Sequence, residues 1–260
     1  MRQFLNILLI LTLLSACSEK QPTLKVGTIA GPETELIMIA KQVANQRYHL
    51  PVEVISFTDY NLPNTALADH SIDMNIFQHA PYLAATNNTR GYHLIAVGKT
   101  FIYPMGIYSK RYQALQALPK NGRIAIPNDP TNEARALQVL AKAGLIQLSK
   151  ADFFVSTQDI IANPKNLSFI PMNAAQLPRV VDEVDAAVIN TNYAIPAGLY
   201  PSKDALFQET KDSDYANLIV IRSQDQNDPN IQTFVKAIQS PEVIAKAREL
   251  FGNNAIVAWE

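Results

Sequence analysis

Residues 126–137 constrain the fold of this chain most strongly, because they specify a strand, a turn and the start of a helix in one short stretch. The segment 123–126 is a short apolar strand. Asp129 can accept hydrogen bonds from the free amides of a first helical turn, and Pro130 suits the first helical position because it has no N–H group. Gly144 is typical of the residue that ends such a helix. The pattern predicts a β-α unit of an α/β fold.

Arg135 is the first candidate for ligand binding. It follows Thr131 by one turn, so its guanidinium can reach the helix N-terminus, where the free amides and the helix dipole favour an anion. A ligand carboxylate would be well stabilised there. The alternative is that Arg135 pairs with a neighbouring side chain on a solvated helix face, as many helix arginines do.

The rest of the chain continues the alternation of strands and helices. Strands are expected at 24–28, 51–57, 71–77 and 92–98, and helices at 33–45, 61–68 and 81–88. After an extended segment at 100–110 the pattern restarts, with strands at 123–126, 167–171, 186–190 and 215–222 and helices at 130–143, 174–181, 229–239 and 241–251. This order predicts two lobes built on mainly parallel sheets, with the last two helices packed on the first lobe. Ligands of such sheets bind beyond the carboxyl ends of the strands.

Residues 1–16 have the form of a lipoprotein signal peptide. A short basic start precedes the apolar residues 4–14 and the sequence Leu14-Ser15-Ala16-Cys17. The apolar run is shorter than the roughly 20 residues that span a bilayer, which disfavours a permanent transmembrane helix. We expect Cys17, the only cysteine, to become the lipidated N-terminus and residues 17–23 to form a tether. An ordinary leader with an incidental cysteine is the alternative.

Composition and missing motifs exclude several classes of protein. With 22 basic and 23 acidic residues, the net charge of −1 gives no reason to expect a nucleic-acid partner. The sequence contains neither GxGxxG nor GxxxxGK[ST], so no phosphate-binding loop is expected. It also lacks GxSxG, and its 4 histidines have no metal-ligand spacing. We therefore expect no cofactor, no metal and no enzyme activity, with a small α/β hydrolase as the alternative.

Aromatic residues gather at the ends of two neighbouring predicted strands. Tyr60 ends one strand, while Phe77, His79 and Tyr82 surround the end of the next. Such a group can form the wall of a pocket for an apolar side chain, and a thioether is especially suited because sulfur packs well against aromatic rings. The alternative is that Phe77 and Tyr82 belong to the core and that His79 is a surface residue with its hydrogen bonds satisfied.

Asn190 and Asn217 also lie at strand ends. A side-chain amide carries both donors and an acceptor, so the two residues could bind the ammonium and carboxylate groups of one ligand. Their alternative role is local, as helix caps or turn residues.

Seven motifs that occur in order along the chain resemble the methionine-binding lipoproteins of the MetQ/NlpA family. They extend the similarity from about Leu24 to Trp259. The motifs are Phe77-Gln78-His79-x-Pro81-Tyr82-Leu83, Tyr103-Pro104, Ile126-Pro127-Asn128-Asp129-Pro130-Thr131-Asn132 with Arg135, Asn163-Pro164-Lys165-Asn166-Leu167, Gln176-Leu177-Pro178-Arg179, Val188-Ile189-Asn190-Thr191-Asn192-Tyr193-Ala194 and Asn217-Leu218-Ile219-Val220.

This resemblance implies an α/β, two-lobed periplasmic-binding-protein fold of type II-like form, with a ligand cleft between the lobes. We expect lobe 1 to comprise residues 24–102 with 218–260, and lobe 2 residues 103–217. The implied function is capture of methionine, with L-methionine as the first choice, and delivery to an ABC importer made of a permease and its ATPase. The implied location is the cell envelope, with the lipid on Cys17 as the membrane anchor.

The resemblance also implies a role for each candidate residue. Arg135 would bind the ligand carboxylate, and Asn190 and Asn217 would contact its amino and carboxylate ends. The side-chain pocket would be formed by the aromatic group of Tyr60, Phe77, His79 and Tyr82. Three alternatives remain open: a preference for D-methionine, a preference for a methionine-containing dipeptide, and a surface role in adhesion or sensing.

Overall fold

The computed structural model describes residues 22–210 and 214–259. The predicted signal peptide, Cys17 and the tether up to residue 21 lie outside the described residues. Within the described part of the chain, no helix combines the length and apolar character needed to cross a membrane.

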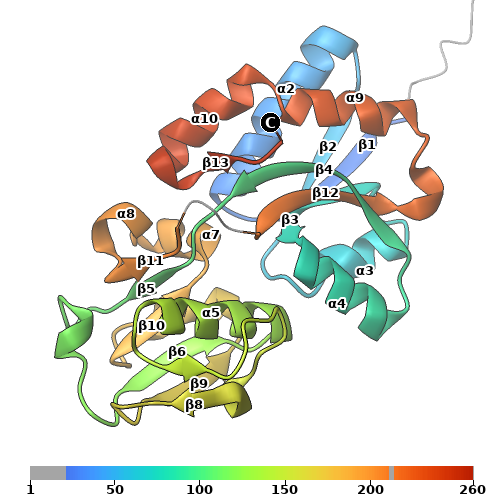
Figure 1. The fold of residues 1–260 in the computed structure, drawn as a ribbon. Coiled ribbons are helices and arrows are strands. Elements are labelled where there is room, and N and C mark those ends of the chain that lie inside the picture. The colour runs from blue at the N-terminus through green and yellow to red at the C-terminus, as the bar shows by residue number, and fades with distance from the viewer. Residues whose placement is uncertain (1–21, 211–213, 260) are drawn as a thin grey trace, which may run out of the picture.

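Two large sheets organise the molecule, one in each half (Figure 1). In spatial order, the six-stranded sheet contains β13 (Ile256–Val257), β4 (Leu94–Ile102), β12 (Ala216–Arg222), β3 (Met74–His79), β1 (Leu24–Ile29) and β2 (Val52–Phe57). The five-stranded sheet contains β11 (Phe207–Gln208), β5 (Gly106–Tyr108), β10 (Ala186–Ile189), β6 (Arg123–Pro127) and β9 (Ser168–Met172). A small hairpin joins β7 (Gln147–Leu148) to β8 (Ile160–Ala162). We call the two parts the six-stranded half and the five-stranded half.

Helices cover both halves. The six-stranded half carries α2 (Pro32–Tyr48), α3 (Pro63–Ala68), α4 (Ala80–Arg90), α9 (Pro229–Ile238) and α10 (Pro241–Phe251). The five-stranded half carries α5 (Pro130–Lys142), α6 (Leu177–Val180), α7 (Thr191–Ala194) and α8 (Pro201–Asp204). Figure 1 shows α2, α9 and α10 together on one side of the six-stranded sheet, and α3 and α4 on the other. The C-terminal helices α9 and α10 therefore pack against α2, on the half that contains the first strands.

The expectation of mainly parallel sheets is wrong for the six-stranded half. Its strands β2, β1 and β3 are parallel, because helices connect them as crossovers. Strand β12 instead returns from the other half, enters between β3 and β4, and runs antiparallel to both. The five-stranded sheet is also mixed, since β5 is antiparallel to β10 and β11.

Several element boundaries also differ from the sequence-based expectation. Strand β3 begins later than expected and continues to His79, which is therefore the last residue of a central strand. Strand β4 continues to Ile102, where an end at residue 98 was expected. The helix expected at 174–181 is a 3-10 turn, Ala174–Gln176, followed by the single turn α6. Pro178 lies within α6 and donates no backbone hydrogen bond, which favours such a short element.

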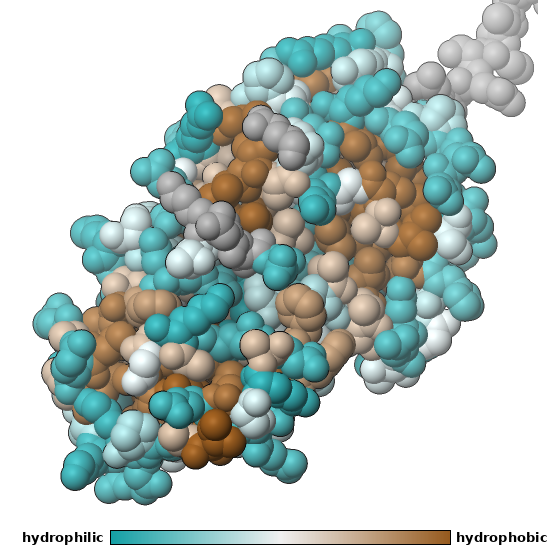
Figure 2. All heavy atoms as spheres, viewed as in Figure 1, coloured by the Kyte–Doolittle hydropathy of each residue, from teal (hydrophilic) through white to brown (hydrophobic). Residues whose placement is uncertain are grey.

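The chain passes twice between the halves. It leaves the six-stranded sheet after Ile102 and enters the five-stranded sheet at Gly106. It leaves that sheet after Gln208 and rejoins the first at Ala216. Residues 211–213 of the return segment lie outside the described residues. Figure 2 shows hydrophilic residues around the rim of the viewed face, with apolar residues gathered over each half.

A shared apolar cluster joins the two halves. Ile29 and Phe77 of the six-stranded half pack in one cluster with Tyr108, Ile189 and Tyr193 of the five-stranded half. The remaining core is divided into three clusters, one under α2, α9 and α10, one around α5 and one under α3 and α4. The candidate site lies beside this shared cluster.

Candidate functional site

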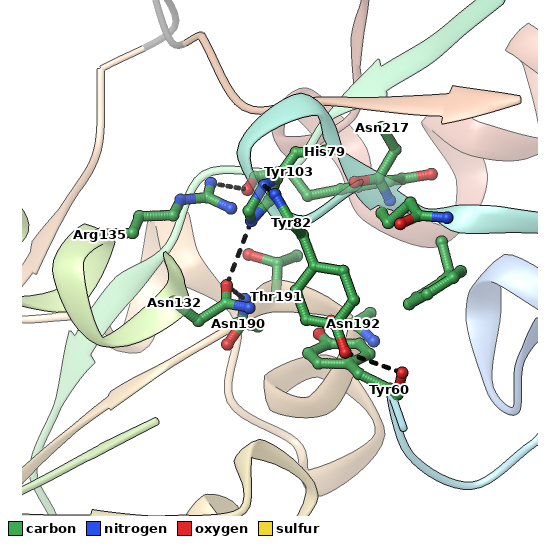
Figure 3. Close-up of a pocket in the computed structure, with 12 residues that line it drawn as sticks. Tyr60, His79, Tyr82, Tyr103, Asn132, Arg135, Asn190, Thr191, Asn192 and Asn217 are labelled. Atoms are coloured by element: carbon green, nitrogen blue, oxygen red, sulfur yellow. Dashed lines mark hydrogen bonds between the residues drawn. The ribbon is translucent and has the colours of Figure 1, made fainter. Parts of the chain in front are cut away.

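A pocket lies between the two halves of the molecule. Both halves contribute side chains to it. All seven predicted ligand-binding residues line this pocket: Tyr60, Phe77, His79, Tyr82, Arg135, Asn190 and Asn217. Figure 3 shows the labelled side chains converging from strands and helix starts of both halves.

His79 is held by the start of α4. It is the N-cap residue of that helix, and its Nδ1 accepts a hydrogen bond from the Tyr82 backbone N–H at 3.3 Å. Its other ring nitrogen, Nε2, lies 3.4 Å from Asn132 Oδ1 in the five-stranded half. Burial of the ring, together with the nearby charge of Arg135, lowers the pKa of His79 to about 3, so the imidazole is neutral at physiological pH.

Hydrogen bonds connect Asp129, the N-cap residue of α5, through the side-chain amide of Asn132 to Asn190 in the pocket. Asp129 accepts from the Asn132 backbone N–H at 3.0 Å and from its side-chain Nδ2, which leaves Asn132 Oδ1 free to accept. Asn190 Nδ2 donates to that oxygen at 2.8 Å. Asn190 Oδ1 is then a buried acceptor without a hydrogen-bond partner among the described residues. A buried acceptor in a pocket wall is suited to a donor that a ligand supplies.

Aromatic rings form one wall of the pocket. Tyr60, Phe77 and Tyr82 lie with their ring centroids 5.7 to 6.1 Å apart in each pair. The Tyr60 ring also packs at a tilt against Tyr193 of α7, with the ring centroids 5.0 Å apart, and its hydroxyl donates to Asn192 Oδ1 at 2.7 Å. These two contacts cross between the halves, so Tyr60 helps to hold them together around the pocket.

Arg135 is buried, with 4% of its surface exposed, and it already binds a carboxylate of the chain. Its Nε donates to Glu209 Oε1 at 3.0 Å, and its Nη2 donates to Glu209 Oε2 at 2.5 Å. Nη2 also donates to the Tyr103 carbonyl oxygen at 2.9 Å. The Arg135 side chain additionally lies 4.3 Å from the centre of the Tyr215 ring. The expected alternative, a solvated surface pair, is wrong because this ion pair is buried.

Sequence reasoning missed other residues around the site. Gln78, Tyr103, Asn132, Thr191 and Asn192 line the pocket but were not among the predicted ligand-binding residues. All five fall within motifs that carried the family resemblance, which was the available signal. Glu209 had no such signal, because only the fold brings it to Arg135.

No group of three or more His, Cys, Asp or Glu side chains in the described ranges is arranged to hold a metal ion. The polar groups of the residues that line the pocket are instead one guanidinium, one neutral imidazole, several amides and the hydroxyls of Thr191 and three tyrosines.

Comparison with known proteins identifies the family. The model of the NlpA lipoprotein family matches residues 24–259. The chain belongs to the NlpA lipoprotein family. A family member from Salmonella typhi, named D-methionine-binding lipoprotein MetQ, is 46% identical over 245 residues, covering 93% of this chain and 90% of the relative.

Solved structures of relatives share the fold. A periplasmic substrate-binding protein of an ABC transporter from Coxiella burnetii is 54% identical, with a TM-score of 0.89 over 91% of this chain and 100% of the other. A nutrient-binding protein from Burkholderia cenocepacia, whose structure contains methionine, is 44% identical, with a TM-score of 0.89 over 91% of this chain and 100% of the other. This member of the NlpA family therefore has the α/β fold of periplasmic substrate-binding proteins. The family consists of binding proteins rather than enzymes.

Proposed function

We propose that this protein captures methionine in the pocket between its two halves and delivers it to an ABC importer. The observation that carries the proposal is that the pocket has two kinds of wall. One contains a buried guanidinium and buried amides, and the other is formed by aromatic rings in tilted and edge-to-face contact. An amino acid with a thioether side chain has matching ends, one zwitterionic and one soft and apolar. The names of the Salmonella typhi and Burkholderia cenocepacia relatives support the same ligand.

Each predicted residue has a specific part in this proposal. Arg135 binds the ligand carboxylate through Nη1, since Nε and Nη2 are engaged by Glu209 and Tyr103. Asn190 and Asn217 contact the polar end of the ligand. The group of Tyr60, Phe77, His79 and Tyr82 surrounds its side chain. We add Asn132 and Asn192 to the predicted ligand-binding residues, because both line the pocket and both contact the six-stranded half.

Capture would occur by closure, with no covalent step. We take the two halves as lobes that move about the two crossings, with boundaries close to 24–102 with 218–260 and 103–217. Residues 216 and 217 belong to β12 and so move with the first lobe. In the closed form Tyr60 bonds to Asn192, and His79 approaches Asn132. A ligand that contacts both lobes at once favours this form over an open one.

Delivery requires a place at the membrane. Lipid on Cys17 would hold the protein in the cell envelope and raise its local concentration near a permease with its ATPase. We expect Cys17→Ser to move the protein from the membrane fraction to the soluble fraction of the envelope, as measured by fractionation and immunoblotting. Retention of this variant in the membrane would contradict the anchor.

Calorimetric titration tests the ligand. The purified protein is unfolded and refolded to remove bound ligand, and then titrated with L-methionine, D-methionine, glycyl-methionine and leucine. We expect the tightest binding for L-methionine and none of comparable strength for leucine, because leucine lacks the sulfur that the aromatic wall favours.

Tighter binding of D-methionine or of the dipeptide would change the expected ligand and leave the proposed function of the protein in place. A folded protein that binds none of the methionine compounds would contradict the proposal and favour a surface role in adhesion or sensing.

A further inference from the structure

Glu33 is a buried carboxyl group directly behind the pocket. It lies in the first turn of α2, and only 5% of its surface is exposed. Among the described residues it has no ion-pair partner, and its Oε2 has no hydrogen-bond partner. Its remaining surroundings include the apolar side chains of Leu36, Ile76 and Phe101. A buried acidic group without a counter-ion is costly, so its position beside a ligand pocket needs an explanation.

One hydrogen bond connects Glu33 to the pocket. Asn217 Nδ2 donates to Glu33 Oε1 at 2.8 Å. Because Asn217 also lines the pocket, this bond determines the orientation of its amide: the nitrogen faces Glu33, and the oxygen is the group that remains for a ligand. An amide oxygen accepts hydrogen bonds from an ammonium group and receives none from a carboxylate. The site is therefore divided, with Arg135 for the negative end and Asn217 for the positive end.

We propose that Glu33 makes the pocket select ligands with a positively charged amino group, by orienting the Asn217 amide and by placing a negative charge behind it. This inference rests on the proposed function, because it concerns how the same site recognises an amino acid. Glu33 is a positioning residue in this scheme, since Asn217 and not Glu33 contacts the ligand. The ammonium group of the ligand provides the counter-charge that the protein itself does not.

Ligand binding should change the protonation state of Glu33. Burial raises the pKa of Glu33 to about 8, although the hydrogen bond from Asn217 opposes this shift. The free protein therefore carries a protonated Glu33 at neutral pH, and this form still accepts the Asn217 bond through its carbonyl oxygen. Entry of an ammonium group favours the carboxylate, as does the N-terminal end of α2. The O–H bond of Glu33 breaks and its proton passes to the buffer.

The groups that face Glu33 do not titrate in the same range. Tyr60, Tyr103 and Tyr193 feel its charge, but burial raises the pKa of each of these hydroxyls above the usual 10. His79 in the pocket is neutral above a pKa of about 3. Between pH 5.5 and 7.5, ligand affinity should therefore increase with pH through Glu33, by up to about tenfold per pH unit.

The test compares two ligands and two variants by calorimetry. The ligands are L-methionine and its 2-hydroxy analogue, in which a hydroxyl replaces the ammonium group. Glu33→Gln keeps an acceptor for Asn217 and removes the charge. Glu35→Gln is the matched control, because Glu35 lies in the same helical turn but is exposed and contacts Lys246 at the surface.

We expect the wild type and Glu35→Gln to prefer methionine over the hydroxy analogue by at least about tenfold. Glu33→Gln should lose most of this preference, while its affinity for the hydroxy analogue stays within about threefold of the wild type. Titrations at pH 7 in phosphate and in Tris, which differ in ionisation heat, should show proton release on methionine binding by the wild type and none by Glu33→Gln.

Unchanged discrimination and unchanged proton release in a folded Glu33→Gln variant would overturn the inference. If Glu33→Gln fails to fold, measurements on the wild type still test the inference. The inference is overturned if the wild type releases no proton on binding methionine and its methionine affinity does not rise from pH 5.5 to 7.5. A wild type that binds neither ligand would instead overturn the proposed function. Binding of methionine without dependence on Glu33 would leave the proposed function intact and remove only this role.

Discussion

At the scale of single residues, Arg135 contributes to stability as well as to the pocket. Arg135→Ala would leave the Glu209 carboxylate buried without its partner. We expect a loss of about 3–5 kcal/mol in the free energy of unfolding, measured by urea titration, because an unpaired buried charge is strongly unfavourable. Lys142→Ala, at an exposed position of the same helix, should change stability by less than about 0.5 kcal/mol.

The paired substitution Arg135→Met with Glu209→Leu separates the two roles of Arg135. Removing both charges should restore much of the stability that the single substitution loses, while methionine affinity stays low. A single Arg135→Ala variant that remains as stable as the wild type would show that Glu209 does not depend on this partner.

The buried His79 should make the free energy of unfolding depend on pH. Its folded pKa of about 3 is below its ordinary value of 6.5 because the ring is buried. Below pH 6.5 the unfolded chain binds a proton that the folded protein does not, so the contribution of His79 to stability is present above pH 6.5 and is lost as pH falls towards 3. The loss should approach about 1.4 kcal/mol per pH unit.

His79→Asn is the variant that tests this effect, because asparagine still caps α4 but does not titrate. The difference in unfolding free energy between the wild type and His79→Asn should shrink by about 2 kcal/mol between pH 6.5 and 4.5. A difference that does not change with pH over this range would contradict the assigned pKa.

At the scale of elements, the start of α5 connects helix capping to the pocket. Asp129 caps this helix and also accepts from the side chain of Asn132, which positions the amide chain to Asn190. Asp129→Ala should cost about 1–2 kcal/mol of stability and also weaken methionine binding, as measured by thermal unfolding and calorimetry.

A matched control for this cap exists in the other half. Asp228 caps α9 and accepts from the Asn230 backbone N–H at 2.8 Å, but it does not line the pocket. Asp228→Ala should lose similar stability without a change in affinity. Equal affinities for both variants would mean that the α5 cap does not position the site.

Local sequence patterns predicted some helix and strand boundaries correctly and others not. The N-cap Asp129 and the N-terminal Pro130 were predicted from sequence, and both are confirmed at the start of α5. The 3-10 turn and short α6 in place of one helix, and the extension of β4, were not predicted. Strand length depends on how many residues find a partner in the sheet, and β4 is extended by pairing with the distant strands β12 and β13.

At the scale of the whole molecule, the closed arrangement depends on contacts between the halves. Tyr60→Phe keeps the ring that packs against Tyr193 and removes the hydroxyl that donates to Asn192. We expect the free energy of methionine binding to weaken by about 1 kcal/mol, the usual value of one hydrogen bond, because closure would lose that contact. Calorimetry measures the change.

Tyr92→Phe provides the control for loss of a tyrosine hydroxyl. Tyr92 donates to Thr65 at 3.3 Å within the six-stranded half. Its substitution should leave affinity unchanged. An affinity of Tyr60→Phe equal to that of the wild type would show that the Tyr60 hydroxyl does not contribute to closure.

The sequence by itself determined what depends on neighbouring residues and on familiar motifs: the α/β class, the capped start of α5, the family, and seven residues that line one pocket. Tertiary structure alone decided the antiparallel insertion of β12, the pairing of Arg135 with Glu209 and the burial of Glu33 behind Asn217. Each of these joins residues that are far apart in the chain. Such contacts depend on which surfaces the fold brings together and removes from water, and no local pattern carries that information.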